Sequence, residues 1–166
     1  YTNVSKNKKW HYHVHDDYEL YCFLSGEGAS YGIENNFYKL KPGDVLIIKK
    51  GKRHYSLVKG EAPHIRYVFN FTPGALLDED GRLKAFLEGI NEKNEYYPAT
   101  HFKEKNWTYY LSRIATAKNF CEKQLYLTVL IDEMCESSPR LISGELGKKD
   151  NILDIISYID NKFKRN

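Results

Sequence analysis

The stretch that decides the fold is HYHVHDDYELYCFLSG, residues 11–26, in which three histidines alternate with other residues ahead of an apolar run. Successive side chains of a β-strand point to opposite faces, so alternate residues share a face. We therefore expect His11, His13 and His15 to point the same way, with Glu19 and Tyr21 following on that face. Imidazoles and a carboxylate that converge inside a small β structure can hold a metal, bind a polar ligand or form a polar core.

The composition is that of an ordinary globular protein. The 166 residues are 42% hydrophobic and 28% charged, enough for one domain or for a domain with a helical appendage. The net charge of +3 is too small by itself to indicate nucleic-acid binding. Cys22, Cys121 and Cys135 are odd in number and widely spaced, which favours reduced thiols. No apolar run is long enough to cross a bilayer, so the sequence predicts a cytoplasmic protein without a membrane partner.

Short strands separated by turn residues occupy the first 73 residues. Gly, Pro and Asn punctuate apolar segments about ten residues apart, and this spacing is typical of a small antiparallel β-barrel or jelly roll. Residues 65–71 show the clearest alternation, with an apolar residue at every second position. The expected strands are 19–25, 29–34, 37–40, 44–49, 54–58 and 65–71.

After Pro73-Gly74 the periodicity becomes helical. Apolar residues recur at three- and four-residue intervals, which predicts helices at 83–90, 107–115, 121–134 and 152–163. Strands followed by helices indicate an α+β fold. We expect a cupin-like β-barrel at 1–73, a helical segment at 74–147, and a linker with one further helix at 148–166.

Two separated histidine-bearing segments resemble the paired motifs of the cupin superfamily. The first reads His13-x-His15-x3-Glu19-x6-Gly26, and the second reads Gly43-x5-Lys49-x-Gly51-x2-His54. The chain departs from the family pattern at three positions that shape turns and do not bind: Asn7, Lys49 and Val58. The resemblance implies a small β-barrel into which both motifs direct their histidines.

The chain as a whole is similar to AraC-family transcriptional regulators. The β half of this family resembles two segments of the chain, Tyr18-Glu19-Leu20 and Lys41-Pro-Gly-Asp44-Val-Leu-Ile-Ile48. Residues 152–163 look like the first helix of the family's DNA-binding domain. The resemblance implies a cupin that senses a small molecule, helices that dimerise, and two helix-turn-helix units that bind DNA. Residue 166 precedes any recognition helix, so we expect DNA contact only through a further C-terminal domain.

Two hypotheses follow for the site. In the first, the barrel is a sensor that binds a small polar effector such as a sugar, with no catalytic residue, no cofactor and no enzyme activity. Its expected ligand-binding residues are His13, His15, Glu19, Tyr21, Tyr31, Arg53 and His54. In the alternative, the chain is a cupin metalloenzyme, an isomerase or a dioxygenase, whose transition-metal ligands are His13, His15, Glu19 and His54. A purely structural dimeriser with a filled barrel is a third possibility.

The expected helix at 121–134 carries a second apolar stripe formed by Leu127, Ile131 and Met134. Leaving such a stripe in water forgoes about 1.5–3 kcal/mol per large side chain, so it has to meet either the helix of Trp107 or a second protomer. The family resemblance favours a homodimer through this stripe. The remaining basic turn, Lys49–Arg53, is either a solvated hairpin tip or a means of bringing Arg53 beside His54.

Overall fold

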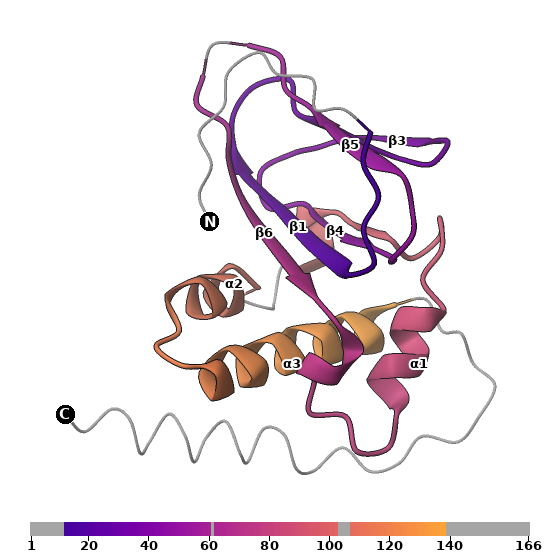
Figure 1. The fold of residues 1–166 in the computed structure, drawn as a ribbon. Coiled ribbons are helices and arrows are strands. Elements are labelled where there is room, and N and C mark those ends of the chain that lie inside the picture. The colour runs from indigo at the N-terminus through magenta and orange to yellow at the C-terminus, as the bar shows by residue number, and fades with distance from the viewer. Residues whose placement is uncertain (1–11, 61, 103–106, 139–166) are drawn as a thin grey trace.

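Two antiparallel sheets form the β part of the protein (Figure 1). The computed structural model describes residues 12–60, 62–102 and 107–138. The larger sheet has the strand order β6-β1-β4-β7 and the smaller one the order β3-β2-β5. The strands are β1 (Tyr18–Ser25), β2 (Ser30–Ile33), β3 (Asn36–Lys39), β4 (Val45–Ile48), β5 (His54–Leu57), β6 (Ile65–Phe71) and β7 (Tyr96–Tyr97).

The helical part follows β6 and lies against the larger sheet (Figure 1). Its helices are α1 (Arg82–Glu88), α2 (Trp107–Thr116) and α3 (Phe120–Ser137), with short 3-10 turns at Pro73–Ala75 and Ala99–Phe102. Asn119 begins α3, because its side chain accepts a hydrogen bond from the backbone N–H of Glu122 at 2.8 Å.

Strand β1 is buried on both faces, and its alternation separates two apolar cores. Leu20 and Cys22 lie in the core between the larger sheet and the helices. Tyr21 and Phe23 lie in the core between the two sheets, which we call the inter-sheet interior. Strand β4 divides in the same way, with Val45 and Ile47 on the helical side and Leu46 and Ile48 in the inter-sheet interior.

The expected α+β fold is confirmed, with one change. In the part of the chain that the structure describes, the cupin-like β part consists of two facing sheets that do not close into a barrel. Strand β7 joins the larger sheet although it comes after residue 74, in a stretch with no strand periodicity. Asp44 anchors this late strand, since its carboxylate accepts hydrogen bonds from the Tyr96 hydroxyl and the Ala99 N–H, both at 2.8 Å.

The stripe assigned to a dimer interface is internal. Leu127, Ile131 and Met134 are all buried in the core between α3 and the larger sheet, and Ile131 is 0% exposed. The prediction of dimerisation through this stripe is therefore wrong, because a single chain already covers it. The alternative partner, the α2 helix of Trp107, shares this core.

Some sequence predictions lie outside the described residues: the orientation of His11, the boundary at 147/148, the linker that follows it and the helix at 152–163. Among the helices that the structure does describe, none is both long and apolar enough to span a membrane.

Candidate functional site

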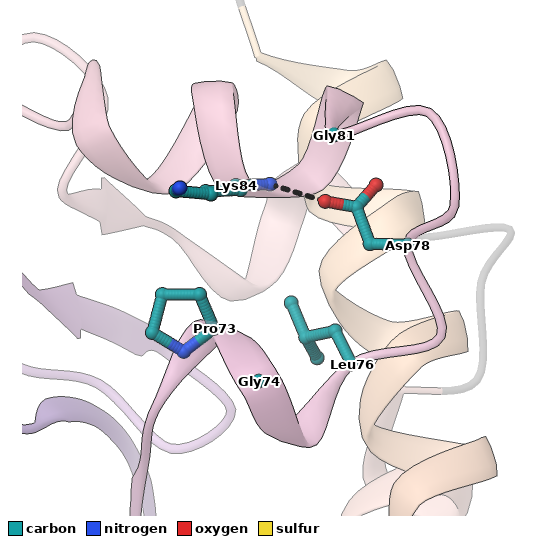
Figure 2. Close-up of a pocket in the computed structure, with 6 residues that line it drawn as sticks. All are labelled: Pro73, Gly74, Leu76, Asp78, Gly81 and Lys84. Atoms are coloured by element: carbon teal, nitrogen blue, oxygen red, sulfur yellow. Dashed lines mark hydrogen bonds between the residues drawn. The ribbon is translucent and has the colours of Figure 1, made fainter.

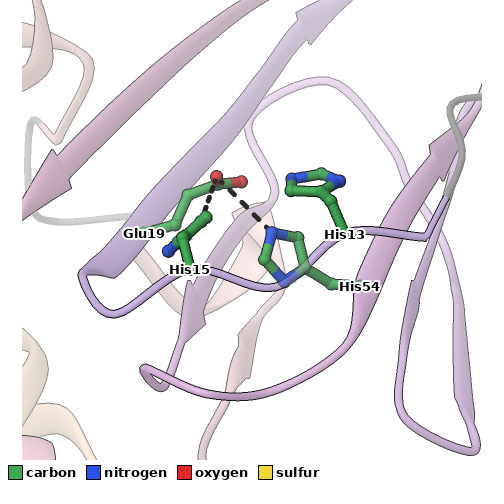
Figure 3. A group of neighbouring side chains, drawn as sticks. All are labelled: His13, His15, Glu19 and His54. Atoms are coloured by element: carbon green, nitrogen blue, oxygen red, sulfur yellow. Dashed lines mark hydrogen bonds and ion pairs between the residues drawn. The ribbon is translucent and has the colours of Figure 1, made fainter.

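The predicted histidines and glutamate meet at one end of the inter-sheet interior (Figure 3). His13 lies in the segment before β1, and its backbone exchanges two 3.1 Å hydrogen bonds with His54 at the start of β5. Glu19 is the second residue of β1, and His15 lies just before the bend that leads into that strand. The local bridge between His13 and His54 therefore brings together two motifs that are far apart in sequence.

One potential ligand atom from each of His13, His15, Glu19 and His54 lies within 4.8 Å of the other three. We call these four residues the His–Glu cluster. The ring centroid of His54 is 4.1 Å from that of His13 and 4.9 Å from that of His15. His54 and Glu19 are only 1% and 5% exposed, whereas His13 is exposed. The cluster is thus anchored inside the protein and reaches the surface at His13.

Backbone carbonyls fix the orientation of two of the imidazoles. Nδ1 of His15 is 2.8 Å from the carbonyl oxygen of Asp17, and Nδ1 of His54 is 2.8 Å from that of Lys52. Because a carbonyl oxygen only accepts hydrogen bonds, Nδ1 carries the proton in both rings. Each neutral ring then offers its Nε2 lone pair to the cluster, as in metal-binding histidines whose other ring nitrogen donates to a carbonyl oxygen.

Tyr31 orients the carboxylate of Glu19. The Tyr31 hydroxyl donates to Oε1 at 2.6 Å, while Oε2 lies 3.3 Å from Nε2 of His15 and 3.7 Å from Nε2 of His54. Burial raises the pKa of Glu19, but the facing His54 and the Tyr31 hydroxyl outweigh it and hold the pKa below its usual value. Burial lowers the pKa of His54, but Glu19 and the Lys52 carbonyl outweigh it and raise the pKa.

These contacts make the cluster a cation site. If both rings were neutral, two Nε2 lone pairs would face the negative Oε2 of Glu19, which is repulsive. A proton on Nε2 removes this repulsion, and so does a metal ion between the three groups. A donor set of imidazole nitrogens and one carboxylate oxygen suits the divalent transition metals, so the residues fit a metal as well as a proton.

Of the other predicted ligand-binding residues, Tyr31 contacts the cluster through Glu19. Tyr21 does not: its hydroxyl shares a 2.8 Å hydrogen bond with Nε2 of His64. The two tyrosine rings nevertheless lie together, with centroids 4.6 Å apart. Tyr21 therefore lines the same interior but belongs to a different polar group.

Arg53 points away from the cluster. Its side chain is 65% exposed, and Nε lies 3.7 Å from a carboxylate oxygen of Glu34. That carboxylate also accepts a 2.9 Å hydrogen bond from the backbone N–H of Arg53. Glu34 takes a left-handed conformation in the turn after β2, and these contacts stabilise it there. The expectation that Arg53 joins the site is therefore wrong, since Glu34 holds it at the surface.

Three polar residues near the site were missed from the sequence: the exposed Asn70 and the buried His64 and Arg66. Asn70 pairs with Glu19 across β6 and β1, and its amide nitrogen lies 3.3 Å from Nε2 of His15. The alternation of β6 contains the signal. Its odd-numbered residues are apolar, and Tyr67, Phe69 and Phe71 lie on the helical side, so Arg66 and Asn70 leave the strand on the opposite face. His64 gives no such signal, because its partner Tyr21 is 43 residues away.

A separate open hollow lies beside α1, away from the cluster (Figure 2). Its volume is about 460 Å³, and it is lined by Pro73, Gly74, Leu76, Asp78, Gly81 and Lys84. The Asp78 carboxylate accepts hydrogen bonds from the backbone N–H groups of Leu83 and Lys84, at 2.9 and 2.8 Å. This carboxylate therefore stabilises the start of α1.

The fold and the cluster together define a cupin-like protein. In agreement, the cupin domain family matches residues 3–69. No curated protein matches the sequence.

One solved structure has a similar fold over the whole chain, and shorter stretches resemble two others. ToxT from Vibrio cholerae is 17% identical with a TM-score of 0.53, over 100% of this chain and 66% of ToxT. The DMSP lyase DddQ from Ruegeria pomeroyi DSS-3 is 24% identical with a TM-score of 0.38, over 42% of this chain and 34% of the lyase. The plu4264 protein from Photorhabdus luminescens is 20% identical with a TM-score of 0.38, over 42% of this chain and 57% of that protein. This chain thus spans from 34% to 66% of their lengths. At 17% identity the likeness to ToxT concerns the fold alone.

Proposed function

We propose that this chain is the effector-sensing region of an AraC-type transcriptional regulator, and that its effector enters the inter-sheet interior. The motif resemblance supports this proposal, as does the ToxT match, which extends over the helices as well as the sheets. In the proposal the regulator acts as a homodimer and contacts DNA through a helix-turn-helix domain. The dimer has to use a surface other than Leu127, Ile131 and Met134, which are internal.

One observation carries the proposal: β1 joins the site to the helices. Glu19 and Tyr21 face the smaller sheet, while Tyr18, Leu20 and Cys22 on the other face of the same strand pack in the core with α3. A ligand that shifts β1 therefore changes the packing under the helices. A sensor requires such a link, because an effector acts only through a free-energy difference between two arrangements.

A ligand screen with matched variants tests the sensing function. We would measure thermal unfolding of the wild type, Glu19→Gln and Glu34→Gln against sugars, polyols and organic acids. Glu34 is the control, because it is a surface glutamate paired with Arg53. At a hundred times its Kd, an effector adds about 2.7 kcal/mol of stability, or roughly 5–10 °C for a chain of this size.

The effector should stabilise the wild type and Glu34→Gln but not Glu19→Gln, and it should slow hydrogen exchange in α3. Equal stabilisation of all three proteins would place binding elsewhere. A screen without any stabilising compound, or one that leaves α3 unchanged, would contradict the sensing function.

The His–Glu cluster supports a second candidate, a metal-dependent cupin enzyme. The observation that favours it is the inward Nε2 of His15 and His54 beside Oε2 of Glu19. His13, His15, Glu19 and His54 would hold the ion, which would supply Lewis-acid or redox chemistry when bound. Tyr31 and the carbonyls of Asp17 and Lys52 would orient these ligands.

Metal analysis separates the two candidates. Purified protein would be assayed for metal content and titrated with Co²⁺, whose visible absorption reports the ligand set without any assay of activity. Under the enzyme hypothesis, the wild type and His64→Gln bind one equivalent, while His15→Ala and His54→Ala do not. A wild type that neither contains a metal nor takes up Co²⁺ would exclude the metalloenzyme.

A further inference from the structure

The open hollow beside α1 has no part in either candidate function. Its volume of about 460 Å³ lies within the range of binding pockets. Pro73, Gly74 and Leu76 supply apolar lining, and Asp78 and Lys84 supply the charged groups (Figure 2). Leu77, which lies between two lining residues in the chain, is 50% exposed. The hollow therefore presents apolar surface that the described residues do not cover.

Two glycines of the lining leave room for another segment to enter. A methyl group built on Gly81 would meet no described atom within 4 Å. A methyl group built on Gly74 would meet only the Thr72 hydroxyl, at the ordinary contact distance of 3.8 Å. Side chains from elsewhere can thus approach the backbone here without displacing their neighbours.

The chain leaves the described residues close to this hollow. Arg82, the first residue of α1, donates to Sγ of Cys135 at 3.3 Å and to the carboxylate of Glu136 at 3.5 Å. Both partners lie in the last turn of α3, whose end is followed by residues 139–166. Since the residue before Arg82 lines the hollow, α3 ends beside it.

The sequence after α3 contains an apolar stripe. The helix predicted at 152–163 would place its large apolar residues on one face, namely Ile152, Ile155, Ile156, Ile159 and Phe163. Leaving such a stripe in water forgoes about 1.5–3 kcal/mol per large side chain. Leu153 lies outside the stripe, because each residue of a helix is rotated by about 100° from the previous one.

The connection between α3 and the stripe is long enough to reach the hollow. Residues 139–151 would span about 40 Å when extended and about 20 Å as a flexible coil. Helices that pack together have axes only about 8–10 Å apart, and α1 shares its core with α3. A tether of this length also keeps the segment at a high effective concentration, so a weak contact suffices.

Opposite charges accompany the hollow and the stripe. The acidic run Asp78–Asp80 borders the hollow, and Lys148 and Lys149 precede the stripe in the sequence. Their attraction is screened by salt, so it orients the segment more than it holds it. The start of the segment would then lie at the acidic run.

We propose that residues 152–163 dock in the hollow beside α1 of their own chain, with the apolar stripe against Pro73, Leu76 and Leu77. Helix α1 is buried in one core with β1, so the docked segment rests on an element that the larger sheet supports. The contact would tie the start of a DNA-binding domain to the sensor. This role rests on the proposed function, whereas the contact itself does not.

Hydrogen exchange of the full chain tests the docking. Ile159→Glu places a charge in the stripe and should speed the exchange of residues 152–163 about tenfold or more. Leu153→Glu adds the same charge outside the stripe and should exchange like the wild type. Glu favours a helix more than Ile does, so faster exchange reports lost docking. Gly74→Trp fills the hollow and should also release the segment, while the exchange of β1 stays unchanged.

Cross-linking with a carbodiimide, which joins neighbouring lysine and carboxylate side chains, locates the contact. In the wild type we expect links from Lys148 or Lys149 to Glu79 or Asp80, with a lower yield in Ile159→Glu but not in Leu153→Glu. A mixture of isotope-labelled and unlabelled protein shows whether these links form within one chain. Links formed only between chains would assign the hollow to a second copy and overturn the proposal.

Two further results would overturn it: exchange of residues 152–163 in the wild type at the rate of a free chain, or equal effects of Ile159→Glu and Leu153→Glu. The first needs no variant. An effector that protects α3 in a chain without docking would leave the sensing function standing. Docking in a chain that no effector stabilises would leave the contact standing and contradict the sensing function.

Discussion

At the scale of single residues, Glu19 sets the charge of the His–Glu cluster, and we predict a bell-shaped pH dependence for its contribution. The native pKa of Glu19 is lowered, so its stabilisation is present above its ordinary pKa near 4.5 and is lost as the pH falls. The native pKa of His54 is raised, so its stabilisation is present below 6.5 and is lost as the pH rises through the native pKa. The pair therefore stabilises most between about pH 4.5 and 6.5.

Urea unfolding of the wild type and Glu19→Gln from pH 3 to 9, in the presence of a chelator, measures this contribution. The difference in unfolding free energy between the two proteins should be largest near pH 5–6 and should shrink on both sides. The same difference for the control Glu34→Gln should be small. A pH-independent difference for Glu19→Gln would show that the carboxylate and the imidazole are not coupled.

His64 should have the opposite dependence. Burial, and then the nearby Arg66 charge, lower the pKa of His64 to about 4 from an ordinary 6.5. As the pH falls, His64 therefore takes up a proton in the unfolded protein before it does so in the native protein. The stability that the neutral imidazole contributes is present above pH 6.5 and is lost as the pH falls towards 4. Replacing His64 by Gln should flatten the fall in unfolding free energy between pH 6.5 and 4. An unchanged slope would contradict the buried, neutral imidazole.

At the scale of elements, the outer face of the smaller sheet depends on Gly32. In β2 this residue pairs with Tyr55 of β5, whose ring crosses directly over it. A methyl group at position 32 would lie 2.0 Å from the Tyr55 ring, and Tyr12 packs on the same ring with centroids 4.4 Å apart. Gly32→Ala should therefore displace Tyr55 and cost about 1–3 kcal/mol of unfolding free energy.

A double-mutant cycle checks this origin of the cost. In a Tyr55→Ala background the added methyl group meets no ring, so the penalty of Gly32→Ala should largely disappear. A penalty of equal size in both backgrounds would assign the cost to the backbone of β2 and not to the aromatic ring.

Helix α3 contributes to stability inside one chain. Ile131 is fully buried against the larger sheet, so Ile131→Ala should lower the unfolding free energy by about 2–5 kcal/mol without changing the molecular mass in sedimentation. Phe120, at the exposed start of the same helix, is the control and should change stability by less than about 0.5 kcal/mol on replacement by Ala. A change of molecular mass with Ile131→Ala would instead show that this stripe contacts a second protomer.

Local patterns predicted these elements, and partners distant in sequence account for what was missed. The two-residue period of apolar side chains in β6 and the 3.6-residue period in α3 depend only on residues close in sequence, so the sequence predicts both elements. The spacing of His13, His15 and Glu19 is equally local. Strand β7 has only two residues, and its pairing with Val45 and Leu46 leaves no periodic signal. An apolar stripe cannot reveal whether its neighbour belongs to the same chain, which is why α3 was misassigned.

At the scale of the whole molecule, sheet and helices share one core. Leu20 and Ile47 of the larger sheet are buried together with Leu87 of α1 and Leu130 of α3. The sequence boundary at residues 73/74 therefore cuts through this core. A fragment of residues 1–73 would expose the apolar face of β1 and β4 and would lack β7. The boundary therefore separates a strand-rich and a helix-rich part of the sequence, each of which needs the other to bury its apolar residues.

We accordingly predict that the sheet and the helices unfold together. Hydrogen exchange under increasing denaturant should open the peptides of β1 and α3 with the same free energy, because neither can lose its partner and keep its buried surface. A fragment of residues 1–138 should fold, whereas a fragment of residues 1–73 should lack the far-ultraviolet circular dichroism of a β structure. Exchange of α3 at a lower denaturant concentration than β1, or a folded 1–73 fragment, would make the helices a separate unit. In that case the path proposed for the effector signal, from Glu19 through β1 to α3, would lose its physical basis.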